Sequence, residues 1–218
     1  ESIAPGEPLA VTVSWDAGGA QPTSISVEVN GEAKQIFISE GKAVALWGVP
    51  LGSEPGSVPV KVSITDDHER VVQLEQTVTV SEDTREIEEL NLSSSTTDVI
   101  TPEGRELEQT TLDAAYALSS ERPFPQWSEP FMQPTEGRFT SPFGLPRRYV
   151  AGGNISYHFG TDIASPEGTA IYATNAGRVL VADFYPIKGG LVVIDHGASV
   201  YSLYFHQSKL HVKVGEIV

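Results

Sequence analysis

The chain of 218 residues has no cysteine, a single methionine and no apolar run of membrane-spanning length. The lack of cysteine excludes both a disulfide framework and thiolate metal ligands. A transmembrane helix needs about 20 apolar residues, so we expect no membrane span in this segment. The absence of thiols is compatible with the bacterial periplasm or the cell surface, where a free thiol is a liability. Because the first residue is Glu1, with no leader pattern, we expect a longer reading frame or a removed signal peptide.

Basic residues are also scarce. The chain has 14 Lys and Arg against 29 Asp and Glu, and its formal net charge is −15. Residues 1–100 alone hold 17 acidic and 5 basic residues. Binding to phosphates needs a basic patch, so this balance argues against nucleic acid as a partner. The excess of acidic residues in 1–100 is better explained by a contribution to solubility than by binding of a ligand.

The 20 glycines and 15 prolines favour short strands and many turns over long helices. In the first 82 residues, alternating apolar residues predict strands at Pro8–Trp15, Ser24–Asn30, Lys34–Ser39, Ala43–Gly48, Val58–Thr65 and Arg70–Val80. The dipeptide Asn30-Gly31 is typical of a hairpin turn. We therefore predict an immunoglobulin-like β-sandwich over 1–82. It is either a structural spacer or a module that binds the cell wall or a partner.

Residues 83–130 are predicted to be a linker that contains one helix. Thr101-Pro102-Glu103 is a helix-start pattern, with a hydroxyl N-cap, proline at the first position and an acid in the first turn. An apolar stripe then runs to about Ser120, formed by Leu107, Leu112, Ala115 and Leu118. The proline-rich segment that follows carries the aromatic residues Phe124, Trp127 and Phe131, and we expect it to wrap a surface.

Residues 131–218 are predicted to be β again. The expected strands are Thr169–Ala173, Gly177–Phe184, Gly190–His196 and Val200–His206. The chain as a whole is thus expected to be mainly β, with an N-terminal sandwich, a short helical linker and a C-terminal β-sheet domain.

Chemistry at neutral pH must draw on the five histidines and the carboxylates. The most informative stretch places His158 and Asp162 four residues apart, with Gly160 between them to let the backbone bend. Imidazole nitrogen and carboxylate oxygen are both zinc ligands, although this pattern alone fits a structural histidine at least as well.

The remaining histidines and a pair of arginines are weaker candidates for functional residues. His196 lies at a strand end and is expected to be structural, and His68 and His211 are expected to be solvated. Arg147 and Arg148 either meet a peptide carboxylate or belong to a solvated loop.

Four ordered blocks carry a family resemblance. They are GRFTSPFG (137–144), HFGTDIASPEGTAIYATNAGRV (158–179), GGLVVIDHG (189–197) and YSLYFHQSKLHVKVGEIV (201–218). Their order and spacing resemble the catalytic domain of LytM/lysostaphin-type zinc peptidases, over about residues 131–218. The resemblance implies a LytM-type antiparallel sheet domain, Zn²⁺ as cofactor, and peptidoglycan peptides as substrate.

The resemblance also assigns roles to individual residues. His158 and Asp162 correspond to zinc ligands, and His206 to a catalytic histidine near the metal. Tyr204 stands two residues before it. Asn154 occupies a position that often faces substrate in the family, so we predict Asn154 and Tyr204 to be substrate-binding residues.

One element of the family pattern is absent. The third zinc ligand comes from a later His-x-His pair, and no such pair occurs before Val218. Catalytic zinc sites use three protein ligands and a water, so we expect a domain cut short and, in this segment, weak metal binding without turnover.

The predicted function of the complete protein is a zinc-dependent metalloendopeptidase that hydrolyses peptidoglycan cross-links, located in the periplasm or outside the cell. The alternative is a catalytically inactive LytM-like domain that binds the wall or activates an amidase.

Overall fold

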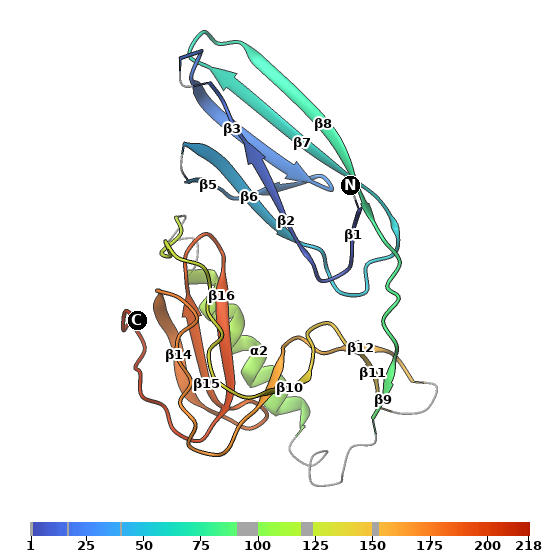
Figure 1. Ribbon diagram of the computed structural model, residues 1–218, viewed down its shortest axis with the longest axis vertical. Coiled ribbons are helices and arrows are strands. Elements are labelled where there is room, and N and C mark those ends of the chain that lie inside the picture. The colour runs from blue at the N-terminus through green and yellow to red at the C-terminus, as the bar shows by residue number, and fades with distance from the viewer. Residues whose placement is uncertain (1, 17, 40, 91–99, 119–123, 150–152) are drawn as a thin grey trace. The chain divides into compact units, whose positions relative to one another are not determined.

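The computed structural model describes residues 2–16, 18–39, 41–90, 100–118, 124–149 and 153–218. Over these residues the fold is mainly β with one α-helix, as the composition predicted (Figure 1). The chain forms two compact units. The first comprises 1–88, 143–147 and 155–160, and the second comprises 89–142, 148–154 and 161–218.

The first unit holds two β-sheets. One has the strand order β1-β8-β7-β3-β4, built from Ser2–Ile3, Val71–Val80, Gly56–Asp66, Pro22–Val29 and Glu32–Lys34. The other has the order β2-β6-β5, built from Pro8–Val13, Lys42–Gly48 and Ile36–Ser39. Neighbouring strands are antiparallel, except that β1 runs parallel to β8.

Both sheets contribute side chains to one apolar core. Val27 and Val29 of β3, each 1% exposed, meet Ala43 and Ala45 of β6, which are equally buried. Their period of two is the alternation that the sequence showed. Predicted strand Lys34–Ser39 is wrong in one respect, because the chain leaves the first sheet after β4 and enters the second at β5.

The second unit is organised around an antiparallel sheet of three consecutive strands. These are β14 (Arg178–Tyr185), β15 (Gly189–Asp195) and β16 (Tyr201–Gln207), in that order. Two short pieces of sheet precede it in the chain, and the three-stranded one consists mostly of residues of the first unit. They pair β10 (Arg138–Ser141) with β13 (Asp162–Ala164), and order β12 (Ser156–Tyr157), β11 (Pro146–Arg148) and β9 (Glu88–Glu89) side by side.

Helix α2 (Pro102–Ala117) lies against this sheet (Figure 1). Thr101 is its N-cap, as predicted, and its hydroxyl accepts the Gly104 N–H at 3.0 Å. The predicted apolar stripe is only half right. Leu107 and Leu118 are about half exposed, at 52% and 48%, and the buried positions are Gly104, Glu108, Leu112 and Ala115. None of the described helices is long and apolar enough to span a membrane.

The sheet is covered on both faces, which makes β15 its most buried strand. Leu191 and Val193, both 0% exposed, pack with Leu112 and Ala115 of α2. The intervening residues of β15, Val192 and Ile194, pack on the other face. Their neighbours there are Val179, Tyr204, Ala173, Ala182, Leu210, Val212 and Val218.

The proline-rich segment runs along the unit in an extended form. The Gln126 N–H donates to His196 O at 2.6 Å, and the Met132 N–H donates to Thr174 O at 2.9 Å. The predicted strand Thr169–Ala173 is wrong. Those residues join no sheet, because Tyr172 pairs with Pro134 of the extended segment instead.

The packing of α2 makes a stability prediction. Leu112→Ala should lower the free energy of unfolding of the second unit by about 2–5 kcal/mol, since it leaves a cavity against Leu191 and Val193. Leu107→Ala on the exposed face of the same helix should change it by less than about 0.5 kcal/mol. Urea unfolding followed by far-UV circular dichroism measures both, and equal effects would mean that α2 is only a tether.

Candidate functional site

His158 is held through its backbone immediately after β12. Its N–H donates to Leu145 O at 2.9 Å, and its carbonyl accepts the Gly144 N–H at 2.7 Å. These bonds continue the pairing of β12 with β11, in which Tyr157 lies opposite Pro146. The imidazole is half-buried and belongs to the first unit.

Asp162 begins β13, in the second unit, and its side chain is exposed. It lies opposite Ser141 of β10, where the register of the pair shifts. The Thr140 hydroxyl donates to the Asp162 carbonyl at 3.3 Å. A bulge at such a point redirects a side chain relative to the regular pleat.

Gly160 does not use its freedom to take a positive φ. A Cβ built there would come no closer than 3.9 Å to His158 Nε2, so neither backbone strain nor crowding requires glycine at this position. The joining of His158 and Asp162 on one ion remains a prediction from the sequence.

His206 has an unusual backbone. It lies in β16 with φ of 58°, a left-handed conformation that is rare for residues with a side chain. Its N–H donates to Lys188 O at 2.8 Å, and its imidazole is exposed. Between the pairs Gly190–Gln207 and Val192–Tyr204, β15 has one residue and β16 has two. His206 thus sits in a β-bulge, a device that re-aims side chains beside functional sites.

Tyr204 is placed differently from what a substrate contact requires. It is only 8% exposed, and its hydroxyl accepts the Thr174 N–H at 2.8 Å. Ser202 Oγ lies 2.8 Å from the same hydroxyl. Asn154, the other predicted substrate residue, is exposed just before β12.

His196 has a structural place, in line with the sequence expectation. It is 0% exposed, with Nδ1 2.7 Å from Ala176 O and Nε2 2.8 Å from Ser202 Oγ. A carbonyl can only accept, so Nδ1 carries the proton and Nε2 of the neutral ring accepts from Ser202. Burial lowers the pKa of His196 below 6.5, and the Ala176 carbonyl and Asp195 oppose that only in part.

Arg147 and Arg148 each meet a carboxylate of β9. Arg147 Nε lies 3.2 Å from Glu88 Oε2, and Arg148 Nη1 lies 2.5 Å from Glu89 Oε1. Both cations therefore serve pairing within the protein in this structure.

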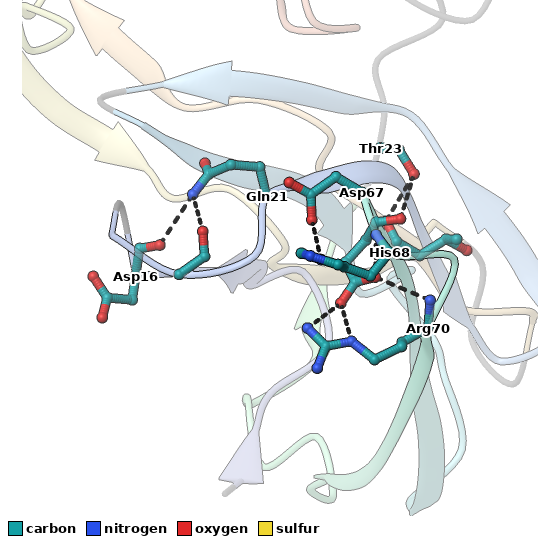
Figure 2. Close-up of polar contacts among 9 residues, drawn as sticks. Asp16, Gln21, Thr23, Asp67, His68 and Arg70 are labelled. Atoms are coloured by element: carbon teal, nitrogen blue, oxygen red, sulfur yellow. Dashed lines mark hydrogen bonds and ion pairs between the residues drawn. The ribbon is translucent and has the colours of Figure 1, made fainter.

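Within the described ranges, the group of three potential ligands whose atoms come together lies elsewhere, at the turn between β7 and β8. The ligand atoms of Asp66, Asp67 and His68 lie within 4.8 Å of one another. Figure 2 shows the labelled members of this turn, with Asp67 bonded to His68 and Arg70 close by.

The polar contacts of this turn account for its acidic residues. Asp66 accepts the His68 and Arg70 N–H groups at 2.9 Å each, and it pairs with the Arg70 guanidinium at 2.8 Å. Bonds from Arg70 and His68 lower the pKa of Asp66, although partial desolvation acts in the opposite direction. The group is a hairpin tip held by its own charges.

Sequence reasoning missed Glu108. It is 1% exposed on the inner face of α2, and its carboxylate meets residues 187–188. The signal was present in the spacing, since Gly104, Glu108 and Leu112 share one helix face. A carboxylate among apolar positions of a stripe signals a buried polar contact.

Comparison with known proteins places the chain in a family context. Residues 156–218 match peptidase family M23. The peptidoglycan DD-endopeptidases ShyB and ShyA of Vibrio cholerae are 36% and 37% identical over 81 residues, which is 37% of this chain and 19% of each relative. The lipoprotein YgeR of Escherichia coli, of uncharacterised function, is 32% identical over 50% of this chain and 42% of its own length. The match thus spans about a fifth of the two endopeptidases.

A solved structure extends the likeness beyond the matched segment. A crystal structure from Pseudomonas aeruginosa, assigned provisionally to peptidase M23, superposes with a TM-score of 0.55 at 25% identity. The superposition covers 96% of this chain and 76% of the other.

The buried His196 predicts a pH dependence of stability. Its folded-state pKa lies below its ordinary value, so only the unfolded chain takes up the proton as the pH falls below 6.5. The free energy of unfolding should therefore decrease from pH 7.5 to pH 5.5. His196→Gln should flatten this slope, whereas Val193→Ala, which destabilises the same core, should leave it unchanged. Urea titrations at several pH values measure the slope, and an identical slope in both variants would contradict the prediction.

Proposed function

We propose that the chain belongs to peptidase family M23, whose family model matches residues 156–218, and that the complete protein is a zinc metalloendopeptidase that hydrolyses the peptide cross-links of peptidoglycan. The observation that carries the proposal is the retention of His158, Asp162 and His206 at their family spacing, with His206 exposed on a bulged strand.

The donor set fits zinc. His158 offers an imidazole nitrogen and Asp162 a carboxylate oxygen, both of which bind zinc at about 2.0–2.2 Å. In this structure His158 is half-buried and Asp162 is exposed. The third ligand of the family pattern, a histidine from a later His-x-His pair, stays a prediction. The chemistry supplied by zinc when bound is Lewis-acid activation of a water and of the scissile carbonyl.

We assign His206 to proton transfer. An imidazole exchanges protons near neutral pH, so His206 can take a proton from the attacking water or give one to the leaving amine. Tyr204 is proposed to act indirectly, by fixing β16 through its bond from Thr174 N. Asn154 is exposed and is proposed to contact the substrate peptide.

The remaining assignments follow the same proposal. The two sheets of the first unit, which share one core, are proposed to form an immunoglobulin-like sandwich that acts as a spacer or wall-binding module. Residues 131–218 are proposed to be the LytM-type peptidase domain. Two V. cholerae relatives are peptidoglycan endopeptidases and an E. coli relative is a lipoprotein, which supports the cell envelope, in the periplasm or outside the cell, as the site of action.

Three variants of the full-length protein test the metal and catalytic roles separately. His158→Ala and Asp162→Ala should each lose zinc and activity together. His206→Ala should keep its zinc and lose about 10²–10⁴-fold in kcat, the usual contribution of a positioned acid or base. Zinc is measured by elemental analysis, and activity by release of soluble fragments from cross-linked peptidoglycan.

His211→Ala is the matched control, because His211 is an exposed histidine in the same matched segment. It should retain both zinc and activity. Full zinc in His158→Ala would remove the metal assignment. A wild-type protein that binds peptidoglycan but neither holds zinc nor cleaves would favour the inactive regulator.

A further inference from the structure

The carboxylate of Glu108 is a buried charge with every oxygen in use. Oε1 accepts the Ile187 N–H at 2.7 Å and the Lys188 N–H at 2.9 Å, and Oε2 meets Lys188 Nζ at 2.7 Å. The Glu108 side chain is 1% exposed and that of Lys188 is 23% exposed. Burial acts to raise the pKa of Glu108, but these three bonds outweigh it and lower that pKa, so the group stays ionised.

The turn that Glu108 holds lies directly against His206. Lys188 presents its carbonyl to the His206 N–H at 2.8 Å. The next residue, Gly189, also has a left-handed backbone, and a Cβ on it would lie 3.4 Å from His206 Cα. Lys188 Nζ lies 5.5 Å from the ring centroid of Phe205, the other residue of the bulge.

The left-handed backbone of His206 needs such support. A non-glycine residue in this region carries strain of order 1 kcal/mol, which persists only where surrounding contacts enforce it. The bond to Lys188 O is the backbone contact that the structure shows for the His206 N–H. Its acceptor belongs to a turn anchored from outside the sheet by Glu108.

We propose that Glu108 is a positioning residue for His206, which it serves by clamping the turn at residues 187–188 so that the Lys188 carbonyl fixes the bulge. This inference rests on the proposed function, in which His206 is catalytic. It makes α2 part of the catalytic apparatus, although the helix lies outside the segment that matches the peptidase family.

Glu108→Gln is a sharp test because it keeps the size of the side chain. An amide has one acceptor oxygen and one NH₂ donor. Whichever way it is turned, the NH₂ group faces either the two turn N–H groups or the Lys188 ammonium. The turn should therefore loosen without a cavity, and kcat of the full-length enzyme should fall about 10²-fold, with KM and zinc content unchanged.

A rescue variant separates clamping from general stability. In Glu108→Gln/Lys188→Met the ammonium is gone, so the amide oxygen can accept the turn N–H groups and its NH₂ can point to the vacated side. This double variant should recover most of kcat relative to Glu108→Gln alone. A double variant as slow as Glu108→Gln would overturn the clamp.

A double-mutant cycle asks whether Glu108 acts through His206. In the His206→Ala background, Glu108→Gln should have almost no further effect on kcat. An undiminished loss there would mean that Glu108 acts on catalysis by another route, and the proposal would fall. If His206→Ala itself leaves kcat unchanged, the proposed function fails instead, so the two failures are distinguishable.

Amide hydrogen exchange supplies a readout that does not depend on activity. In Glu108→Gln, the His206 N–H should exchange at least about tenfold faster, since its acceptor has loosened. The amides of Val193 and Leu203, paired with each other in the middle of the sheet, serve as controls and should keep their rates. Unchanged exchange at His206, or equal acceleration at all three amides, would contradict a positioning role.

Discussion

The second unit depends on one constraint, which is that β15 has no face toward solvent. The side chains of Leu191 and Val193 pack in the core between the sheet and α2. Those of Val192 and Ile194 pack in the core on the opposite face of the sheet. A sheet of only three strands buries little by itself, so both covers are needed to exclude water from this strand. The helix and the C-terminal stretch are therefore structural parts of the second unit.

The same constraint explains where the polar groups lie. His196 at the end of β15 is fully buried, and its two ring nitrogens are satisfied by Ala176 and Ser202. Glu108 on α2 is equally buried and satisfied by the turn at 187–188. Each is a polar group on an otherwise apolar surface, and an unpaired group there would weaken the fold by about 1–3 kcal/mol. Glu108 thereby fixes the turn at 187–188, and His196 links the loop residue Ala176 to Ser202 of β16.

Much of this architecture could be predicted from periodicity and turn chemistry. The alternating strand β3 and the continuous apolar strand β15 were predicted to within one or two residues, and Thr101 predicted the start of α2. The failures have local causes. Leu107 and Leu118 are apolar, and so they were predicted to lie in the core. The helix instead buries the face that carries Gly104, Glu108 and Leu112. Residues 169–173 alternate like a strand, yet their backbone pairs with the extended segment.

The sequence proposes which residues form the candidate site, but it does not predict their conformation. The residues Tyr204-Phe205-His206 do not by themselves predict a left-handed backbone. The bulge arises from the register of β16 with β15 and from the turn at 187–188. The buried hydroxyl of Tyr204 was likewise unpredictable, since its partner Thr174 lies 30 residues earlier in the chain.

The strained bulge bears on how this protein can be engineered. At position 206 glycine would relax the backbone, so any procedure that ranks sequences by folding energy alone will tend to replace the histidine there. A thermostable redesign obtained in this way would keep its shape and lose the histidine that we propose for proton transfer. The residue that looks least suited to its place in β16 is thus the one to hold fixed while the surrounding sheet is optimised.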